Sequence, residues 1–262
     1  MKRKVNVSLY TDHPSRSLSL NEIDEFLSGY GFKVSKEGDL FGSMAEDAPG
    51  RLELTRKLSG SVVSDIETPL EHLQEGSPAS LQRELSIMER GNDDPGSVLY
   101  DGNWLQRILY SQLAGASLAG ESVNLIFTGR LFCTFKDRRY HARVVLMGEP
   151  SLLSTSGLVE APARPREYYY IKGRLIQTGH DTAELEEMYR GRYVEYDDDK
   201  ISRIMRSYAL QAVMYSMTGR EFCDSPDCCL YNSHWQEEVL KVHYRSVPCS
   251  ECEKILADYA DF

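Results

Sequence analysis

The chain has 262 residues, of which 41% are hydrophobic and 27% are charged, a composition that excludes a wholly disordered protein. Asp and Glu number 40 against 30 Lys and Arg, so the net charge is -10 and binding to a nucleic-acid backbone is disfavoured. The longest apolar runs, such as Val144–Met147, are too short to span a bilayer, and no apolar stretch follows the basic start. We therefore expect a cytoplasmic protein with no membrane partner.

The first forty residues predict a strand, a helix and a second strand. Val5–Tyr10 alternates apolar and polar residues, which is typical of a strand. Ser19 and Glu22 form a capping-box pattern ahead of an apolar helical stripe, and Phe32–Val34 follows as the next strand. This order indicates a βαβ unit and a partly parallel sheet.

The middle of the chain predicts further helices and strands. Helical patterns lie at Leu52–Leu58, at Leu81–Met88 and over an apolar stripe from Trp104 to Leu113. The predicted strands are Val123–Thr128, Leu131–Phe135, Tyr140–Met147 and Tyr168–Ile171. The fold class that these elements predict is α/β, a mixed sheet packed with helices.

The longest periodic segment is Asp197–Thr218, which predicts a long helix with one buried face. Three aspartates, Asp197–Asp199, lie at its start, where the positive end of the helix dipole stabilises negative charge. Gly219 is suited to the left-handed position that ends a helix.

Five of the six cysteines lie near the C-terminus, spaced as two short pairs. Cys223 and Cys228 form the first pair, and Cys249 and Cys252 form the second. Two such pairs, separated by a loop, can close a tetrahedral site around zinc, and four thiolates leave no open position for catalysis. The spacing predicts one structural zinc ion.

Other interpretations of the cysteines remain open at this point. Disulfide bonds would suit an exported protein, and four cysteines could also hold an iron–sulfur cluster. Cys229 could replace Cys228, and His234 or His243 could replace a thiolate. The sixth cysteine, Cys133, lies in a predicted strand and is expected to be a buried, inert thiol.

The segment from the long helix to the second cysteine pair resembles the archaemetzincin family of zinc metallopeptidases. Their motif runs H-E-x-x-H-x-x-G-x-x-H-C-x4-C-x-M and is followed by C-x-x-C, and Gly219 sets the register here. The resemblance implies a zincin fold, with residues 1–218 as the metzincin-like part and residues 219–262 as a zinc-binding lobe of the same domain. It also implies that the four cysteines hold the structural zinc, and it suggests an archaeal source.

In this register every catalytic residue of the family is replaced. The positions of the three histidine ligands, the general-base glutamate and the methionine become Ala212, Ser216, Phe222, Val213 and Leu230. These side chains cannot hold a catalytic zinc or take a proton from its water. We therefore expect classical peptidase activity to be absent.

Three functions follow as hypotheses. The first is an inactive metallopeptidase homologue whose cleft still binds a peptide or a protein. The second is an active zinc hydrolase with ligands drawn from elsewhere, among His13, His72, His141, His180, His234 and His243. The third is a zinc-stabilised nucleic-acid-binding protein that uses clustered arginines, which the acidic net charge disfavours.

Overall fold

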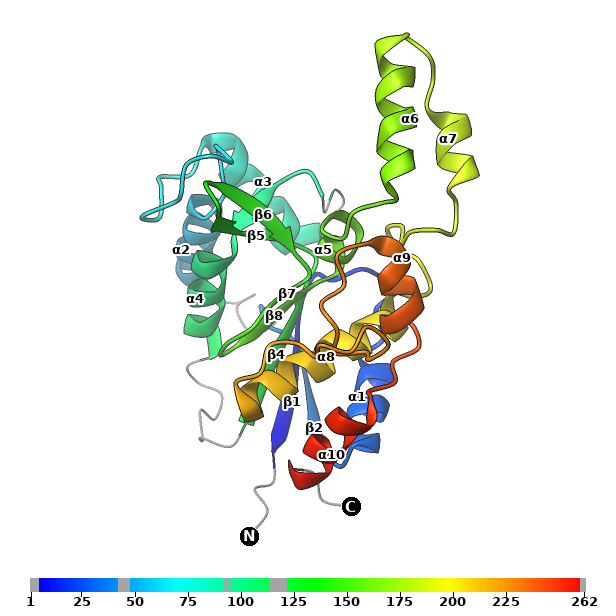
Figure 1. Ribbon diagram of the computed structural model, residues 1–262. Coiled ribbons are helices and arrows are strands. Elements are labelled where there is room, and N and C mark those ends of the chain that lie inside the picture. Colours follow the sequence, from blue (N-terminus) through cyan, green and yellow to red (C-terminus); the bar gives the residue numbers. More distant parts are fainter. Residues whose placement is uncertain (1–4, 42–47, 92–93, 95, 114–121, 260–262) are drawn as a thin grey trace.

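The computed structural model describes residues 5–41, 48–91, 94, 96–113 and 122–259. The central sheet consists of β1 (Asn6–Asp12), β2 (Lys33–Asp39), β4 (Ser122–Thr128), β7 (Val145–Leu146) and β8 (Ser151–Ser154). Its strand order is β2-β1-β4-β8-β7 (Figure 1). The first four strands are parallel and β7 is antiparallel to β8, which confirms the predicted βαβ start and the mixed sheet.

A second, three-stranded sheet forms one side of the molecule. It contains β3 (Leu99–Asp101), β5 (Leu131–Lys136) and β6 (Arg139–Arg143) in the order β3-β5-β6. β5 pairs parallel with β3 and antiparallel with β6. Consequently β6 is an edge strand of this sheet, as β7 is of the central one.

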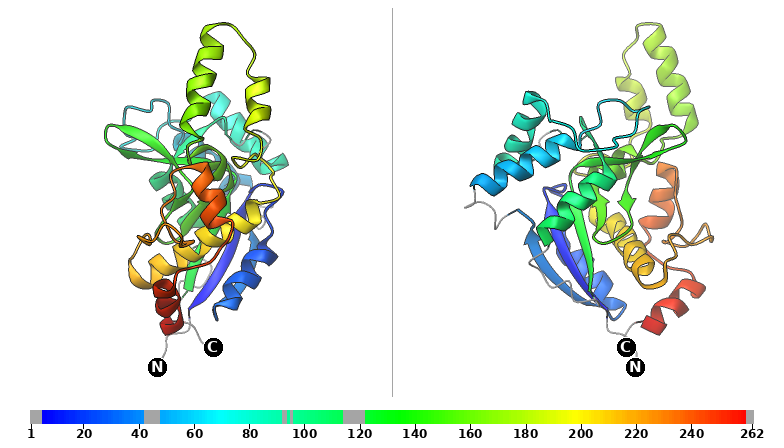
Figure 2. Two further views of the ribbon diagram at one scale, coloured as in Figure 1. Left: turned by 45° about the vertical axis from the view of Figure 1, so that its right-hand side comes forward. Right: turned by 90° about the vertical axis from the view of Figure 1, so that its left-hand side faces the viewer.

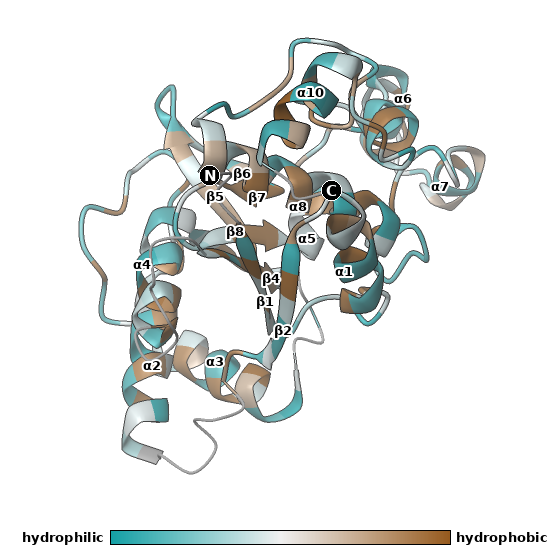
Figure 3. Ribbon diagram, turned by 90° about the horizontal axis from the view of Figure 1, so that it is seen from below, coloured by the Kyte–Doolittle hydropathy of each residue, from teal (hydrophilic) through white to brown (hydrophobic). Residues whose placement is uncertain are grey.

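Helices cover both faces of the central sheet. The helices of the described residues are α1 (Leu20–Gly29), α2 (Ala48–Gly60), α3 (Pro78–Arg90), α4 (Gly102–Leu113), α5 (Thr155–Glu160), α6 (Arg166–Gln177), α7 (Ala183–Met188), α8 (Ile201–Thr218), α9 (Gln236–Glu238), the π-helix η2 (Val239–His243) and α10 (Ser250–Tyr259). Seen from below, Figure 3 places α2 and α4 on one side of the strands and α1 and α8 on the other. In the described part of the chain no helix is long and apolar enough to cross a bilayer.

Alternation along the buried strands fills two cores. In β4, Leu125 and Phe127 lie in the core shared with α1 and α8, whereas Ile126 lies in the core shared with α2 and α4. Successive side chains of a strand point to opposite faces, so one strand serves both cores. The first core also contains Cys223, Cys228 and Leu256, which ties the C-terminal segment to α8.

Helices α6 and α7 form a hairpin that projects from the body (Figures 1 and 2). The predicted strand Tyr168–Ile171 is wrong, because these residues lie within α6. Tyr168 is buried against Leu185, Tyr189 and Tyr193, while the next two tyrosines are exposed. Packing at helical spacing therefore overrides the strand propensity of three consecutive tyrosines.

Two other predicted boundaries differ from the structure. The expected strand Tyr140–Met147 is split between β6 and β7, which belong to different sheets. The carbonyl of Val144, between them, accepts the N–H of Ser154 at 2.8 Å. The long helix begins at Ile201 instead of Asp197, because Asp197 has a φ of 57° and forms part of the preceding turn.

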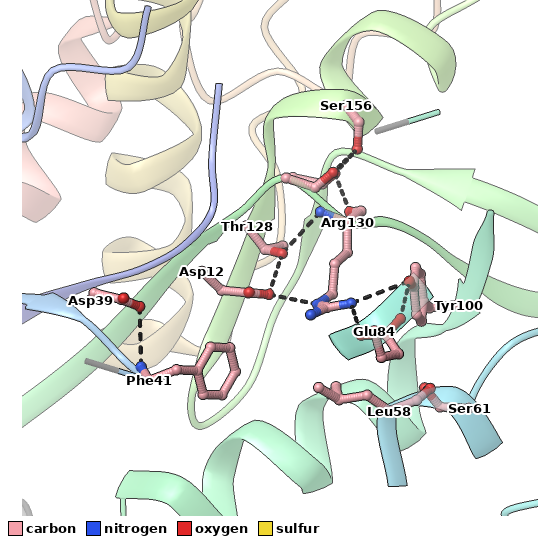
Figure 4. Close-up of polar contacts among 12 residues, drawn as sticks. Asp12, Asp39, Phe41, Leu58, Ser61, Glu84, Tyr100, Thr128, Arg130 and Ser156 are labelled. Atoms are coloured by element: carbon pink, nitrogen blue, oxygen red, sulfur yellow. Dashed lines mark hydrogen bonds and ion pairs between the residues drawn. The ribbon is translucent and has the colours of Figure 1, made fainter. Parts of the chain in front are cut away.

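A buried guanidinium joins the ends of β1 and β4 to α3 (Figure 4). Arg130 is 1% exposed, and its Nε contacts Asp12 Oδ2 at 2.8 Å while its Nη1 contacts Glu84 Oε2 at 2.6 Å. Thr128 and Tyr100 donate hydroxyl hydrogen bonds to the same two carboxylates. Burial opposes the charge, but the carboxylates prevail and raise the pKa of Arg130. The cluster holds three separate elements together.

Replacement of Arg130 by methionine is predicted to destabilise the fold by about 3–5 kcal/mol, because two carboxylates would remain buried without a cation. Denaturant unfolding monitored by circular dichroism measures this loss. The control is Arg190→Met, which removes an exposed ion pair with Glu187 and is expected to change stability by about 0.5 kcal/mol or less. Equal effects of the two substitutions would contradict the role of the cluster.

The hairpin has its own polar cluster around Glu186. Arg164 and Lys172 contact this carboxylate at 2.9 and 3.2 Å, and Tyr168 and Tyr193 donate hydrogen bonds to it. Partial burial opposes ionisation, but the hydrogen bonds and cations prevail and lower the pKa of Glu186 to about 2. The carboxylate thus stabilises the hairpin above its ordinary pKa of 4.5, and this stability is lost as pH falls toward 2.

Glu186→Gln is predicted to weaken the hairpin strongly at pH 6 and much less near pH 2.5, where most of the stabilisation by the carboxylate is lost. Hydrogen exchange of residues 166–193 in both proteins at the same pH measures this difference, since intrinsic exchange rates cancel. A protection difference that stayed constant from pH 6 to 2.5 would contradict the assignment.

Candidate functional site

The four predicted cysteines meet in one cluster. The sulfurs of Cys223, Cys228, Cys249 and Cys252 all lie within 4.8 Å of one another, and three of these residues are buried. The Sγ atoms of Cys223 and Cys249 are 3.7 Å apart. A tetrahedral zinc with bonds of about 2.3 Å requires sulfurs roughly 3.8 Å apart. The donor set and its spacing therefore fit a structural zinc site.

The local backbone prepares these thiols as ligands. The loop after Cys223 turns back on itself, because the N–H of Cys223 donates to Leu230 at 2.8 Å and that of Cys228 donates to Ser225 at 3.1 Å. Backbone N–H groups also point at sulfur, since Cys249 donates to Sγ of Cys228 at 3.2 Å. The second pair lies at the start of α10, which places Cys252 in its first turn.

Hydrogen bonds favour the thiolate form of Cys228, whereas burial raises the pKa of Cys223 and Cys252. A bond from the thiol of Cys229 is the main cause that lowers the pKa of Cys228 to about 4, aided by backbone N–H groups. Cys229 is buried but does not belong to the cluster. Neither His234 nor His243 belongs to it, so the structure favours the four cysteines over the alternative ligand sets. All six cysteines are free, without a disulfide bond.

A cavity of about 400 Å³ lies next to this cluster. Its floor is α8, one wall is the segment from β6 to Met147 that includes β7, and the opposite wall is the loop after Leu230. From α8 the cavity is lined by Tyr208, Gln211 and Tyr215. The other polar or aromatic lining residues are Thr134, Lys136, Arg143, Glu221, Phe222, Tyr231, Asn232, Ser233 and His234.

The positions expected to replace the catalytic residues are dispersed around this cavity. Ala212 and Val213 are buried in the core shared with the sheet, and so is Leu230. Ser216 is exposed, and its hydroxyl donates to the carbonyl of Ala212 at 3.0 Å. Of the five replaced positions, Phe222 lines the cavity.

Gly219 does end the helix, with a φ of 72°. This conformation suits a residue without a side-chain Cβ, as the sequence indicated.

The cavity-lining residues of α8 lie one position before the expected ones. Gln211 precedes Ala212, and Tyr215 precedes Ser216. The apolar stripe of the helix could have identified these cavity-lining residues from the sequence. Ala209 and Ala212 face the sheet, so they cannot line the cavity. Gln211 and Tyr215 lie on the other side of the helix and form its cavity face.

The histidines do not gather into a second metal site. Among the described residues, the cysteine cluster is the one group of three or more metal-ligating side chains. His243 is buried and stacked on Tyr208, with ring centroids 4.4 Å apart, and burial lowers the pKa of His243 to about 4. Cys133 is buried as expected, with its thiol 3.1 Å from the carbonyl of Tyr100.

The arginines that cluster in the sequence do not share one surface in the structure. Arg130 is enclosed by carboxylates, Arg164 pairs with Glu186, and Arg166 lies over the ring of Trp235. Arg138, Arg139 and Arg143 share the β5–β6 hairpin. These described arginines therefore do not form the contiguous charged surface that is expected of a nucleic-acid-binding face.

Cys249→Ser is predicted to abolish stable zinc binding and to lower the melting temperature, because metal binding and folding of this segment are coupled. Elemental analysis and thermal unfolding measure the two effects. Cys133→Ala is the control, since it removes a buried thiol of β5 outside the cluster and should retain one zinc per chain. Retained zinc and unchanged melting in Cys249→Ser would contradict the site.

Comparison with known proteins places the chain among peptidase-like proteins. A similar solved structure is an archaemetzincin from Methanopyrus kandleri, with 13% identity and a TM-score of 0.46 over 97% of this chain and 94% of that chain. Another is a zinc-dependent peptidase from Methanocorpusculum labreanum, with 14% identity and a TM-score of 0.42 over 95% of this chain and 99% of that chain. No curated protein matches significantly. The model of the "Probable metallopeptidase family (DUF6775)" matches residues 3–259, and the chain therefore belongs to this family.

Proposed function

We propose that this protein is a catalytically inactive member of its metallopeptidase family that binds a peptide or protein segment in the cavity above α8. One zinc ion, held by the four cysteines, stabilises the wall of the cavity. The observation that carries this proposal is the floor of the cavity, where α8 presents Gln211 and Tyr215, an amide and a phenol.

The ligand inventory of the cavity supports the loss of catalysis. A hydrolytic zinc needs three protein ligands and an open position for water, usually with a carboxylate as base. Among the described lining residues, Glu221 and His234 are the two that carry a carboxylate or an imidazole. Two such side chains cannot supply both the ligand set and the base.

The edge strands support peptide binding. β6 and β7 are each at the edge of a sheet, and the segment that contains them lines the cavity. An edge strand offers unpaired backbone groups to which an extended peptide can add as a further strand. The structural zinc and the free cysteines are compatible with a reducing compartment, so we propose a cytoplasmic location.

The second candidate function is an active hydrolase with a rebuilt metal site. Glu221 and His234 both line the cavity, so a substrate or a third residue would have to complete the coordination. This candidate requires a second, readily chelated zinc ion, which the inactive scaffold does not.

The test combines hydrolysis and binding on the same protein. We expect no cleavage of a quenched-fluorescent peptide library with or without added zinc, and saturable binding of peptides from the same library by fluorescence anisotropy. Metal-dependent cleavage that disappears in Glu221→Gln and His234→Ala would overturn the proposal in favour of the hydrolase. Absence of peptide binding would overturn it as well.

A further inference from the structure

The cavity floor contains a buried acceptor without a partner. Gln211 is 1% exposed, and its Nε2 donates to the carbonyl of Tyr231 at 3.0 Å. Because only the NH2 group can donate to a carbonyl, this bond fixes the orientation of the amide. The Oε1 atom is thereby left buried without a hydrogen-bond partner. A ligand in the cavity can supply the donor that this buried oxygen lacks.

A second unpartnered polar atom lies in the opposite wall. The hydroxyl of Ser233 is buried and has no partner, and Ser233 lines the same cavity as Gln211. A hydroxyl can donate or accept, whereas the Gln211 oxygen can only accept. The two atoms together offer an acceptor and a hydroxyl to the N–H and C=O groups of a bound peptide.

The wall of the cavity formed by β5 and β6, called the strand wall below, adds positive charge. β5 and β6 are paired with Thr134 opposite His141 and Phe132 opposite Arg143, so Thr134, Lys136 and Arg143 project from one face. The Nε of Arg143 donates to Thr134 at 2.8 Å, which orients the guanidinium. Among the described residues, no carboxylate forms an ion pair with Lys136 or Arg143, although the chain carries ten more acids than bases.

We propose that the cavity selects a peptide with an acidic side chain. Lys136 and Arg143 receive the carboxylate, and Gln211 Oε1 accepts one main-chain N–H of the peptide. This inference rests on the proposed function, because it names the class of peptide that the same cavity takes. Glu221 is the one carboxylate among the described lining residues, so two cations outnumber it at the site.

Charge selectivity is tested with synthetic peptides in matched pairs. Fluorescein-labelled octapeptide pools, with Asp or Glu fixed at one position, are compared with pools that carry Asn or Gln there. We expect the best acidic pool to bind at least about tenfold more tightly at low salt, and the preference to fall in 0.5 M NaCl.

The variants assign that preference to the strand wall. Lys136→Gln and Arg143→Gln should reduce the tenfold preference to less than threefold. Arg138→Gln, which removes an exposed charge in the neighbouring turn outside the cavity lining, should retain it. Equal binding of acidic and neutral pools would overturn this inference and leave the proposed function intact. Failure of every pool to bind would overturn both.

The role of Gln211 is tested on the peptide itself. Methylation of each backbone nitrogen of the best peptide in turn should identify one N–H whose loss weakens binding about tenfold. In Gln211→Met, that penalty should disappear while the other methylation effects persist. Zinc content and melting temperature verify that the variant is folded. A methylation profile identical in both proteins would overturn the assignment.

Discussion

The two-sided burial of α8 is the constraint on which the site depends. One face of this helix fills the core with Met205, Ala209 and Ala212, and no charged group could occupy those positions without a buried partner. The phase of the helix is thereby set by the sheet. Gln211 and Tyr215 are consequently turned toward the cavity, and the chemistry of the site follows from these two side chains.

The cysteine cluster extends this constraint to the opposite wall. The loop that carries Cys223 and Cys228 begins four residues beyond Gly219. The backbone N–H of Cys223 donates a hydrogen bond to the carbonyl of Leu230 at its far end. Tyr231, which comes next, provides the carbonyl that orients Gln211. In the function proposed above, a zinc ion held by the four cysteines would support this wall of the cavity without lining it. The proposed loss of catalysis with retention of the fold rests on this division, because fold and activity depend on different residues.

Local patterns predicted the parts of the structure that depend on short-range spacing. The cysteine pairs, the glycine that ends α8 and the first βαβ unit were all expected, and the family match confirms the resemblance to metallopeptidases. The motif register named Ala212 and Ser216, but the residues of α8 that line the cavity are Gln211 and Tyr215, because the phase of the helix is set by burial against the sheet. The Arg130 cluster could not be foreseen, since its partners lie 118 and 46 residues away.

We expect this peptidase-like fold to bind zinc at the four cysteines and at no catalytic position. Crystals grown with excess zinc, measured at the zinc absorption edge, test it most directly. The account predicts one anomalous peak, between Cys223, Cys228, Cys249 and Cys252. A second peak beside Gln211 or between Glu221 and His234 would contradict it.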